Sequence, residues 1–130
     1  MVTKAIVQMA RDDAMLVSLV GNAEHIFAEI GRGDQTVVFR DNGKSHDESV
    51  KPLKTSRIQI LVDGWNIETG EAIANRALAV LEGLEGSTIT VLGVADYEVK
   101  TVVATSGPTL VQWKNSKMFS ANAIINYIES

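Results

Sequence analysis

Hydrophobic positions in residues 57–86 change their spacing halfway along the stretch. In the first part, Ile58, Ile60 and Val62 fall on one side of the chain, with the period of two that is typical of a β-strand. In the second part, apolar residues recur every three or four positions, as on one side of an α-helix: Ile73, Ala77, Val80, Leu81 and Leu84. The stretch therefore predicts a strand that leads into an amphipathic helix.

Turn-forming residues separate this strand from this helix, at 63–66 (Asp-Gly-Trp-Asn). Asn66 or Thr69 can cap the start of the helix with a side-chain oxygen. Gly83 and Gly86 offer places for the helix to end. A strand and helix joined in this way form a sheet-and-helix core unit, and we expect the rest of the chain to pack around it.

The N-terminal region predicts helical structure in two pieces. Residues 2–10 carry apolar side chains at helical spacing. Asp12 or Asp13 then resembles the N-cap of a second short helix that ends near Gly21. The acidic pair would interrupt a continuous apolar stripe, so two small helices or one bent helix fit better than a single straight one.

Two strands and a polar arm come next in the sequence. Residues 24–30 and 35–40 have strand-like patterns, and the Gly-Arg-Gly-Asp segment at 31–34 predicts a hairpin turn between them. Residues 41–56 contain few apolar side chains, a glycine, a proline and mixed charges. Long connections of this kind are commonly functional or disordered. We therefore expect a loop or arm at 41–56 that serves as a mobile binding element.

The C-terminal part predicts further strands. Residues 87–94 read as a strand, 100–105 as a short strand or extended loop, and 106–108 (Ser-Gly-Pro) as a turn. Residues 109–118 alternate, whereas 121–128 fit either a closing helical turn or a strand. Together these segments predict an α+β fold, with a mainly antiparallel sheet packed against one long central helix and an N-terminal helical segment.

Size and composition narrow the class of protein. The chain has 130 residues, 45% of them hydrophobic and 22% charged, which predicts one globular domain over 1–130. No apolar run approaches the roughly 18 residues of a membrane span, and we expect no membrane partner and no signal peptide. The absence of cysteine excludes disulfides and thiolate metal sites. A net charge of −4 disfavours broad nucleic-acid binding.

The two histidines do not match a catalytic or metal-binding motif. His25 lies within a predicted strand, where a satisfied or surface histidine is the simpler interpretation. His46 lies near Asp41, Asp47 and Glu48, but this cluster lacks the spacing of an EF-hand or a zinc site. We interpret it as part of a solvated loop.

The acidic groupings have structural explanations. Helix capping and the helix dipole account for Asp12, Asp13, Asp63, Glu68 and Glu71. The glycine-rich segment 31–34 precedes a strand, whereas a phosphate-binding loop needs a helix after it. Trp65 is expected to be a partly buried lid on the core. We therefore expect no catalytic residue, no metal and no cofactor.

The order of these elements resembles that of the tail completion or tail terminator proteins of long-tailed bacteriophages. The resemblance covers about residues 5–94. It rests on the N-terminal helical pair ending in LVG, the segments EHIFAEI and TVVFR, a polar insertion and RIQILVDGWNIETGEAIANRALAVLEGLEG. Its centre is a strand that ends in Asp-Gly-Trp, followed by an alanine-rich helix that closes in Leu-Glu-Gly-Leu-Glu-Gly. Residues 96–130 carry no matching motif.

This resemblance implies a structural, non-enzymatic protein of the virion. Such proteins form a ring, usually a hexamer, at the head-proximal end of the tail tube, end tube polymerisation and provide the docking surface for the head–tail connector. The implied partners are copies of the chain itself, the tail-tube protein and the connector protein, with DNA only as cargo passing through the channel. The implied location is the virion tail or neck, assembled in the host cytoplasm.

We expect the subunit or partner interface to use charged residues of the 31–34 turn, the strand after it and the arm. These residues are Arg32, Asp34, Arg40, Lys44, His46, Asp47, Lys51 and Lys54. Two alternatives stay open. One is a head–tail connector or tail-tube subunit, and the other is a small enzyme or ligand-binding domain with a site at Asp63, Trp65 and His25.

Overall fold

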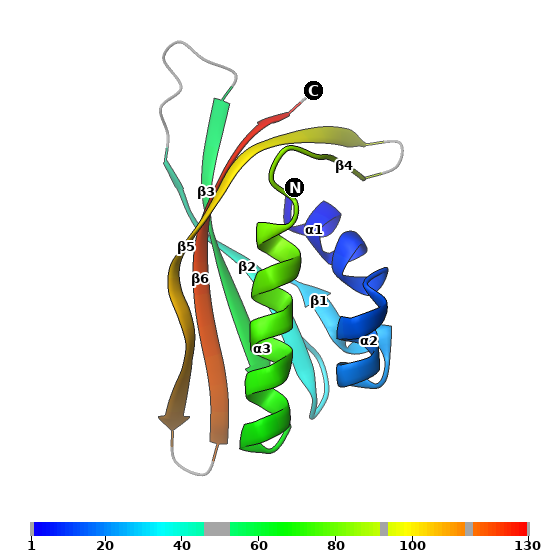
Figure 1. Cartoon of the computed structure of the whole chain (residues 1–130), viewed down its shortest axis with the longest axis vertical. Helices are drawn as coiled ribbons and strands as arrows, with labels where there is room; N and C mark the ends of the chain where they lie inside the picture. The colour runs from blue at the N-terminus through cyan, green and yellow to red at the C-terminus, as the bar shows by residue number, and fades with distance from the viewer. Residues whose placement is uncertain (1, 46–52, 92–93, 114–115, 130) are drawn as a thin grey trace.

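The computed structural model describes residues 2–45, 53–91, 94–113 and 116–129 (Figure 1). Its helices are α1 (Val2–Arg11), α2 (Ala14–Val20), the short 3-10 helix η1 (Ala23–His25) and α3 (Ile67–Glu82). Its strands are β1 (Ile26–Ala28), β2 (Thr36–Ser45), β3 (Leu53–Asp63), β4 (Thr88–Val91), β5 (Ala95–Trp113) and β6 (Ser116–Glu129). The α+β class predicted from the sequence is confirmed.

The strands form a single sheet in the order β1-β2-β3-β6-β5-β4. Every neighbouring pair is antiparallel except β1 and β2, which run parallel. Helices α1, α2 and α3 lie together on one side of the curled sheet (Figure 1). The expectation of a mainly antiparallel sheet with one long helix is therefore right only in part, because the sheet is mixed and α3 shares its layer with α1 and α2.

The parallel pairing of β1 and β2 corrects the predicted hairpin at 31–34. Residues 24–30 form one turn of 3-10 helix and only three residues of strand, since Asn22 caps that turn by accepting from the Glu24 backbone N–H. The chain then reverses at Glu29, which has a φ of 69°. Gly31 lies against the side chains of Thr36 and Val38, so the connector passes back over the sheet before β2 begins.

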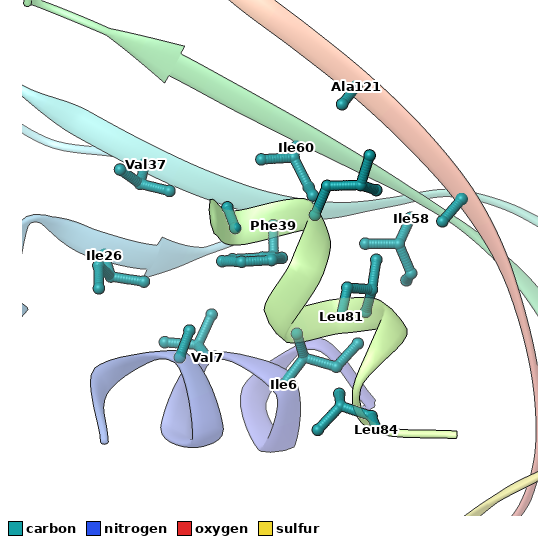
Figure 2. Packing of buried hydrophobic residues seen from close by; sticks show 14 of the residues in the cluster. Ile6, Val7, Ile26, Val37, Phe39, Ile58, Ile60, Leu81, Leu84 and Ala121 are labelled. Atoms are coloured by element: carbon teal, nitrogen blue, oxygen red, sulfur yellow. The ribbon is translucent and has the colours of Figure 1, made fainter. Parts of the chain in front are cut away.

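The core lies between α1, α3 and the helix-facing side of the sheet, the inner face. All six strands contribute buried residues to it, and the central strands β3 and β6 do so from alternate positions: Ile58, Ile60, Val62, Phe119, Ala121, Ala123 and Ile125. Figure 2 shows Ile6 of α1 and Leu81 of α3 near Phe39 and Ile60 of the sheet. Burying each such side chain contributes roughly 1.5–3 kcal/mol. The alternation and helical spacing predicted for 57–86 are confirmed.

Helix boundaries follow from side-chain caps. Asn66 caps α3, because its side-chain oxygen accepts from the Thr69 N–H at 2.8 Å. Asp13 caps α2 in the same way, accepting from the Leu16 N–H at 2.9 Å. Gly21, with a φ of 93°, ends α2 in the left-handed conformation that glycine adopts without strain. The two-piece N-terminal helix is confirmed.

Asp13 also ties α2 to α3. The Arg76 guanidinium donates Nε–H to Asp13 Oδ2 at 2.9 Å and an Nη2 hydrogen to Oδ1 at 2.7 Å. This two-bond geometry matches the fork of the guanidinium to both carboxylate oxygens. The hydrogen bonds from Arg76 are the largest cause that lowers the pKa of Asp13 below its ordinary value.

Strands are longer in the second half of the chain than the sequence pattern indicates. Residues 106–108 are not a turn but lie within β5, and two of the three register shifts in its pairing with β6 occur here, between Ala104 and Ser106 and between Ser106 and Thr109. Residues 121–128 are strand, which resolves the helix-or-strand ambiguity. At the end opposite their connecting turn, β5 and β6 continue past the C-terminal end of α3 (Figure 1).

The predicted arm at 41–56 is mostly strand where the structure describes it. β2 continues to Ser45 and β3 begins at Leu53, and Lys44 pairs with Ser56 across the two strands. Residues 46–52 lie outside the described residues. The low apolar content of 41–56 suggested a loop. Strand ends can have few apolar residues, because backbone hydrogen bonds hold them without a hydrophobic contact on both faces.

Gly64 is a position where we expect substitution to be costly. Its φ is +102°, and a Cβ at this position would lie 2.0 Å from the Asp34 backbone oxygen. Gly64→Ala should therefore destabilise the fold by about 3 kcal/mol or more, from left-handed strain plus displacement of the 34–35 backbone. Urea unfolding at neutral pH measures the effect.

Gly43→Ala is the control, because nothing lies within 4 Å of a Cβ built there. Its change in the free energy of unfolding should stay within about 1 kcal/mol. Equal losses from both substitutions would contradict the close approach at Gly64.

The Asp13 pair should make stability depend on acid pH. Because the folded pKa of Asp13 is lowered, its contribution is present above the unfolded value of about 3.9 and is lost as the pH falls through the folded value. Asp13→Asn keeps a capping oxygen and should lose this part of the acid dependence. Asp13→Ala removes the cap as well and should cost about 1–2 kcal/mol at pH 7.

Chemical denaturation between pH 2 and pH 7 measures both variants. Asp12→Asn is the matched control, since the neighbouring carboxylate is exposed. If Asp12→Asn flattened the acid dependence as much as Asp13→Asn, the assignment to the Arg76 pair would be wrong.

Candidate functional site

The sheet side opposite the helices, which we call the outer face, carries a band of polar side chains. It is formed by the alternate residues of β3 and β6 that do not enter the core. These include Thr55, Arg57, Gln59, Ser120, Asn122 and Asn126. A sheet with one face on the core and one uncovered face is expected to alternate in this way.

Three amide side chains of the outer face connect neighbouring strands, and we call them the amide ladder: Gln59, Asn122 and Asn126. Asn126 accepts from Thr55 Oγ1 at 2.6 Å and donates to Thr101 Oγ1 at 2.7 Å, so it joins β3, β6 and β5. Asn122 donates to Ser106 Oγ at 3.0 Å. The ladder satisfies these polar groups within the face.

Gln59 extends the ladder toward β2. It accepts a hydrogen bond from Asn42 Nδ2 at 2.9 Å and donates to Ser120 Oγ at 3.3 Å. Cross-strand pairs of this kind contribute roughly 0.2–1 kcal/mol each to a sheet. The ladder therefore fixes side-chain positions across four strands.

A hollow of about 460 Å³ opens on the outer face. It is lined by Asn42, Arg57, Thr105, Ser106, Asn122 and Ile124. Among the described residues of this lining, Arg57 alone is charged, and it lies directly across from Ile124 in the pairing of β3 with β6. We call this hollow the Arg57 pocket, and it is the candidate binding site.

A second polar group lies where β3, β5 and β6 end together. Lys54 forms an ion pair with Glu129, and this hydrogen bond is the largest cause that lowers the pKa of Glu129. Burial, followed by a hydrogen bond with Glu129, raises the pKa of Tyr97 to about 12. The Tyr97 and Tyr127 rings meet edge to face at 5.7 Å. Their hydrogen bonds and packing hold the strand ends together.

The interface residues expected from the sequence do not form one cluster. Arg32 and Asp34 are exposed on the connector before β2. The 34–35 backbone of this connector packs on Gly64, next to the end of β3. Lys54 lies at the other end of β3, about 30 Å from Asp63 at the rise of an extended strand.

The remaining expected interface residues divide into three cases. Arg40 is half-buried and donates to the Glu29 backbone oxygen at 3.2 Å, so it braces the connector. Lys44 lies on β2. His46, Asp47 and Lys51 lie outside the described residues.

The residues considered for catalysis occupy ordinary structural positions. His25 lies in η1, partly exposed, and not in a strand as expected. Trp65 is partly buried against the core, as predicted. None of His25, Asp63 and Trp65 lines the Arg57 pocket. Among the described residues, no cluster of histidine, aspartate and glutamate has an arrangement able to hold a metal ion.

Sequence reasoning missed the outer face. The signal was present in residues 120–126, where Ser120, Asn122 and Asn126 all fall on alternate positions, with Ile124 between them in the series. It was hidden because isoleucines 124, 125 and 128 also fit a helical turn. Within the part of the chain that the structure describes, no helix is long and apolar enough to span a membrane.

The fold of this chain is similar to that of a protein of known structure. The chain matches one protein in a structure described as the virion of a native gene transfer agent (GTA) particle, with a TM-score of 0.63. The match covers 98% of this chain and 94% of that chain, at 17% sequence identity. No family model and no curated protein matches the sequence. The structural likeness establishes a shared fold.

Tyr97 should lose its proton only at strongly alkaline pH. Since its folded pKa is raised to about 12, its contribution to stability is full below the unfolded value of about 10 and is lost as the pH rises toward 12. Ultraviolet titration of tyrosinate should show a late step near pH 12 that Tyr97→Phe removes. Persistence of the late step in Tyr97→Phe would assign it to another group.

Proposed function

We propose that this protein is a structural subunit of a phage-like virion. In this role it forms a homo-oligomeric ring, a hexamer by family resemblance, at the head-proximal end of the tail. The ring ends tail-tube polymerisation and offers a docking surface to the head–tail connector. The observation that carries the proposal is the fold likeness over 98% of the chain to a protein of the GTA virion. The ordered sequence resemblance to tail terminators supports the more specific role.

The two-layer architecture is suited to a ring. A closed ring requires a heterologous contact, in which two different surfaces of each subunit meet and the rotation between copies closes on itself. The helices cover the inner face of the sheet and leave the outer face without a covering layer in the described chain (Figure 1). Each copy therefore has a helical surface and a sheet surface of different chemistry that can meet.

The backbone groups at the edges of the sheet favour subunits that meet through their faces over subunits that pair their edge strands. Beyond β4, the Val102 N–H of β5 is taken by the Glu85 carboxylate at 3.0 Å, and Pro108 has no N–H to offer. On β2, the Asp41 N–H is taken by the Glu29 carboxylate at 3.0 Å. Occupied N–H groups and proline hinder the addition of a neighbouring strand.

The proposed partners and location follow from this role. The ring contacts the tail-tube protein on one side and the connector on the other, and assembles in the host cytoplasm before it joins the virion. DNA passes through its channel, and a net charge of −4 limits adhesion to the phosphates. Arg32, Asp34 and Lys54, exposed at opposite ends of β3, are proposed contacts to axial neighbours.

Assembly of the purified chain tests the proposal. Sedimentation velocity over a range of protein concentrations should show a discrete oligomer, and negative-stain images should show rings. Added to tail tubes of the parent particle, the protein should bind at one end and stop further growth.

Two outcomes would contradict the proposed role. A strictly monomeric chain at high concentration, with no affinity for tube ends, would exclude the ring. Long tubes formed by this chain alone would instead identify a tail-tube subunit. Labelling the chain in intact particles distinguishes the tail end from the neck.

A further inference from the structure

Arg57 differs from the other arginines that lie within the fold. Of the five arginines, Arg32 lies exposed on the connector before β2, Arg11 donates to the Ile26 carbonyl, Arg40 to the Glu29 carbonyl and Arg76 to Asp13. Arg57 is exposed in its pocket, and no hydrogen bond or ion pair joins its guanidinium to another described residue. Its five N–H donors are therefore available to an incoming group.

The lining of the pocket selects for an anion. Its described lining contains no carboxylate, and the one charged group among those residues is the Arg57 guanidinium. The neighbouring polar groups are hydrogen-bonded to one another, Asn122 to Ser106 and Asn42 to Gln59. They therefore hold the walls of the pocket in place and do not neutralise the charge of Arg57. Ile124, opposite Arg57, supplies an apolar wall that reduces access of water. A planar carboxylate fits the guanidinium fork.

The helical surface of the same protein carries carboxylates of the required kind. One side of α3 is exposed along its length, at Glu68, Glu71, Asn75, Ala79 and Glu82. None of these three glutamates forms an ion pair with another described residue. Asn75 and Ala79 are small or uncharged, so the middle of this stripe permits close approach to a flat surface.

We propose that the Arg57 pocket receives a glutamate from the α3 stripe of a second copy of this chain. This inference rests on the ring proposed above and identifies its subunit contact. The helical surface of one copy packs on the outer face of the next, which is a head-to-tail contact of the kind that closes a ring. The net charge of −4 gives every copy an excess of carboxylates, to which the Arg57 guanidinium on the facing surface is complementary.

The test compares self-association of four proteins by sedimentation velocity. Arg57→Gln should raise the dissociation constant of the oligomer about tenfold or more, because a glutamate would then be buried without its partner. Arg57→Lys keeps the charge but not the fork, and should give an intermediate loss. Lys4→Gln, which removes one exposed positive charge from α1, should change the constant less than about twofold.

Charge exchange identifies the source of the carboxylate. Arg57→Glu should abolish association, and combining it with Glu68→Arg, Glu71→Arg or Glu82→Arg should restore association in one of the three combinations. Circular dichroism and thermal unfolding of each variant confirm that the monomer is folded. Arg57 is exposed, so these substitutions should leave the monomer intact.

Each contrary result has a distinct meaning. A wild-type chain that never associates overturns the ring and the pocket contact together. Wild-type association that is unchanged in Arg57→Gln overturns the pocket contact alone. Loss in Arg57→Gln with no restoring exchange overturns the α3 stripe as the source. Binding of inorganic phosphate or acetate that depends on Arg57, with association unaffected, assigns the pocket to a free anion.

Discussion

The contact of α3 with strands β3 and β6 determines how the other elements are placed. Ile73, Ala77 and Leu81 of the helix are fully buried over the inner face, where Ile58 and Ile60 are also fully buried. Because the turn at 63–66 joins β3 directly to α3, this contact forms between neighbouring segments and brings little loop-closure entropy. Helix α1 then covers the part of the sheet that α3 leaves open, and Arg76 fixes the start of α2 through Asp13.

The same contact leaves the two sides of the sheet with different chemistry. Alternation places the buried apolar residues on the inner face, and the outer face carries most of the polar residues of β3 and β6 beside a few apolar ones such as Ile124. The connector at 29–35 covers only the β2 end of the outer face, where Val38 is 4% exposed beneath Gly31. The amide ladder occupies the band of the outer face between β2 and β5. A fold that used helices on both faces would have no such surface.

The sequence predicted the parts of the fold in which one period dominates. Residues 57–86 alternate and then change to helical spacing, so β3 and α3 were predictable. Each cap was narrowed to two residues, Asp12 or Asp13 and Asn66 or Thr69, and the structure selects Asp13 and Asn66. The parallel β1–β2 pairing was not, because it depends on a backbone reversal at Glu29 that no residue type marks. The outer-face site was missed because Arg57 and Asn122 are 65 positions apart in the sequence and meet only through the pairing of β3 with β6.

The amide ladder explains how a polar face can be buried without a large loss of free energy. Burying an unsatisfied amide costs about 1–3 kcal/mol, whereas an amide already bonded within its own face loses few contacts with water. Gln59, Asn122 and Asn126 are bonded in this way before any partner arrives. Arg57 is the exception, since burying its charge is unfavourable unless an anion meets it. The face therefore tolerates a covering surface in general but favours one that places a carboxylate at Arg57, and such a carboxylate would set the register and direction of the proposed contact.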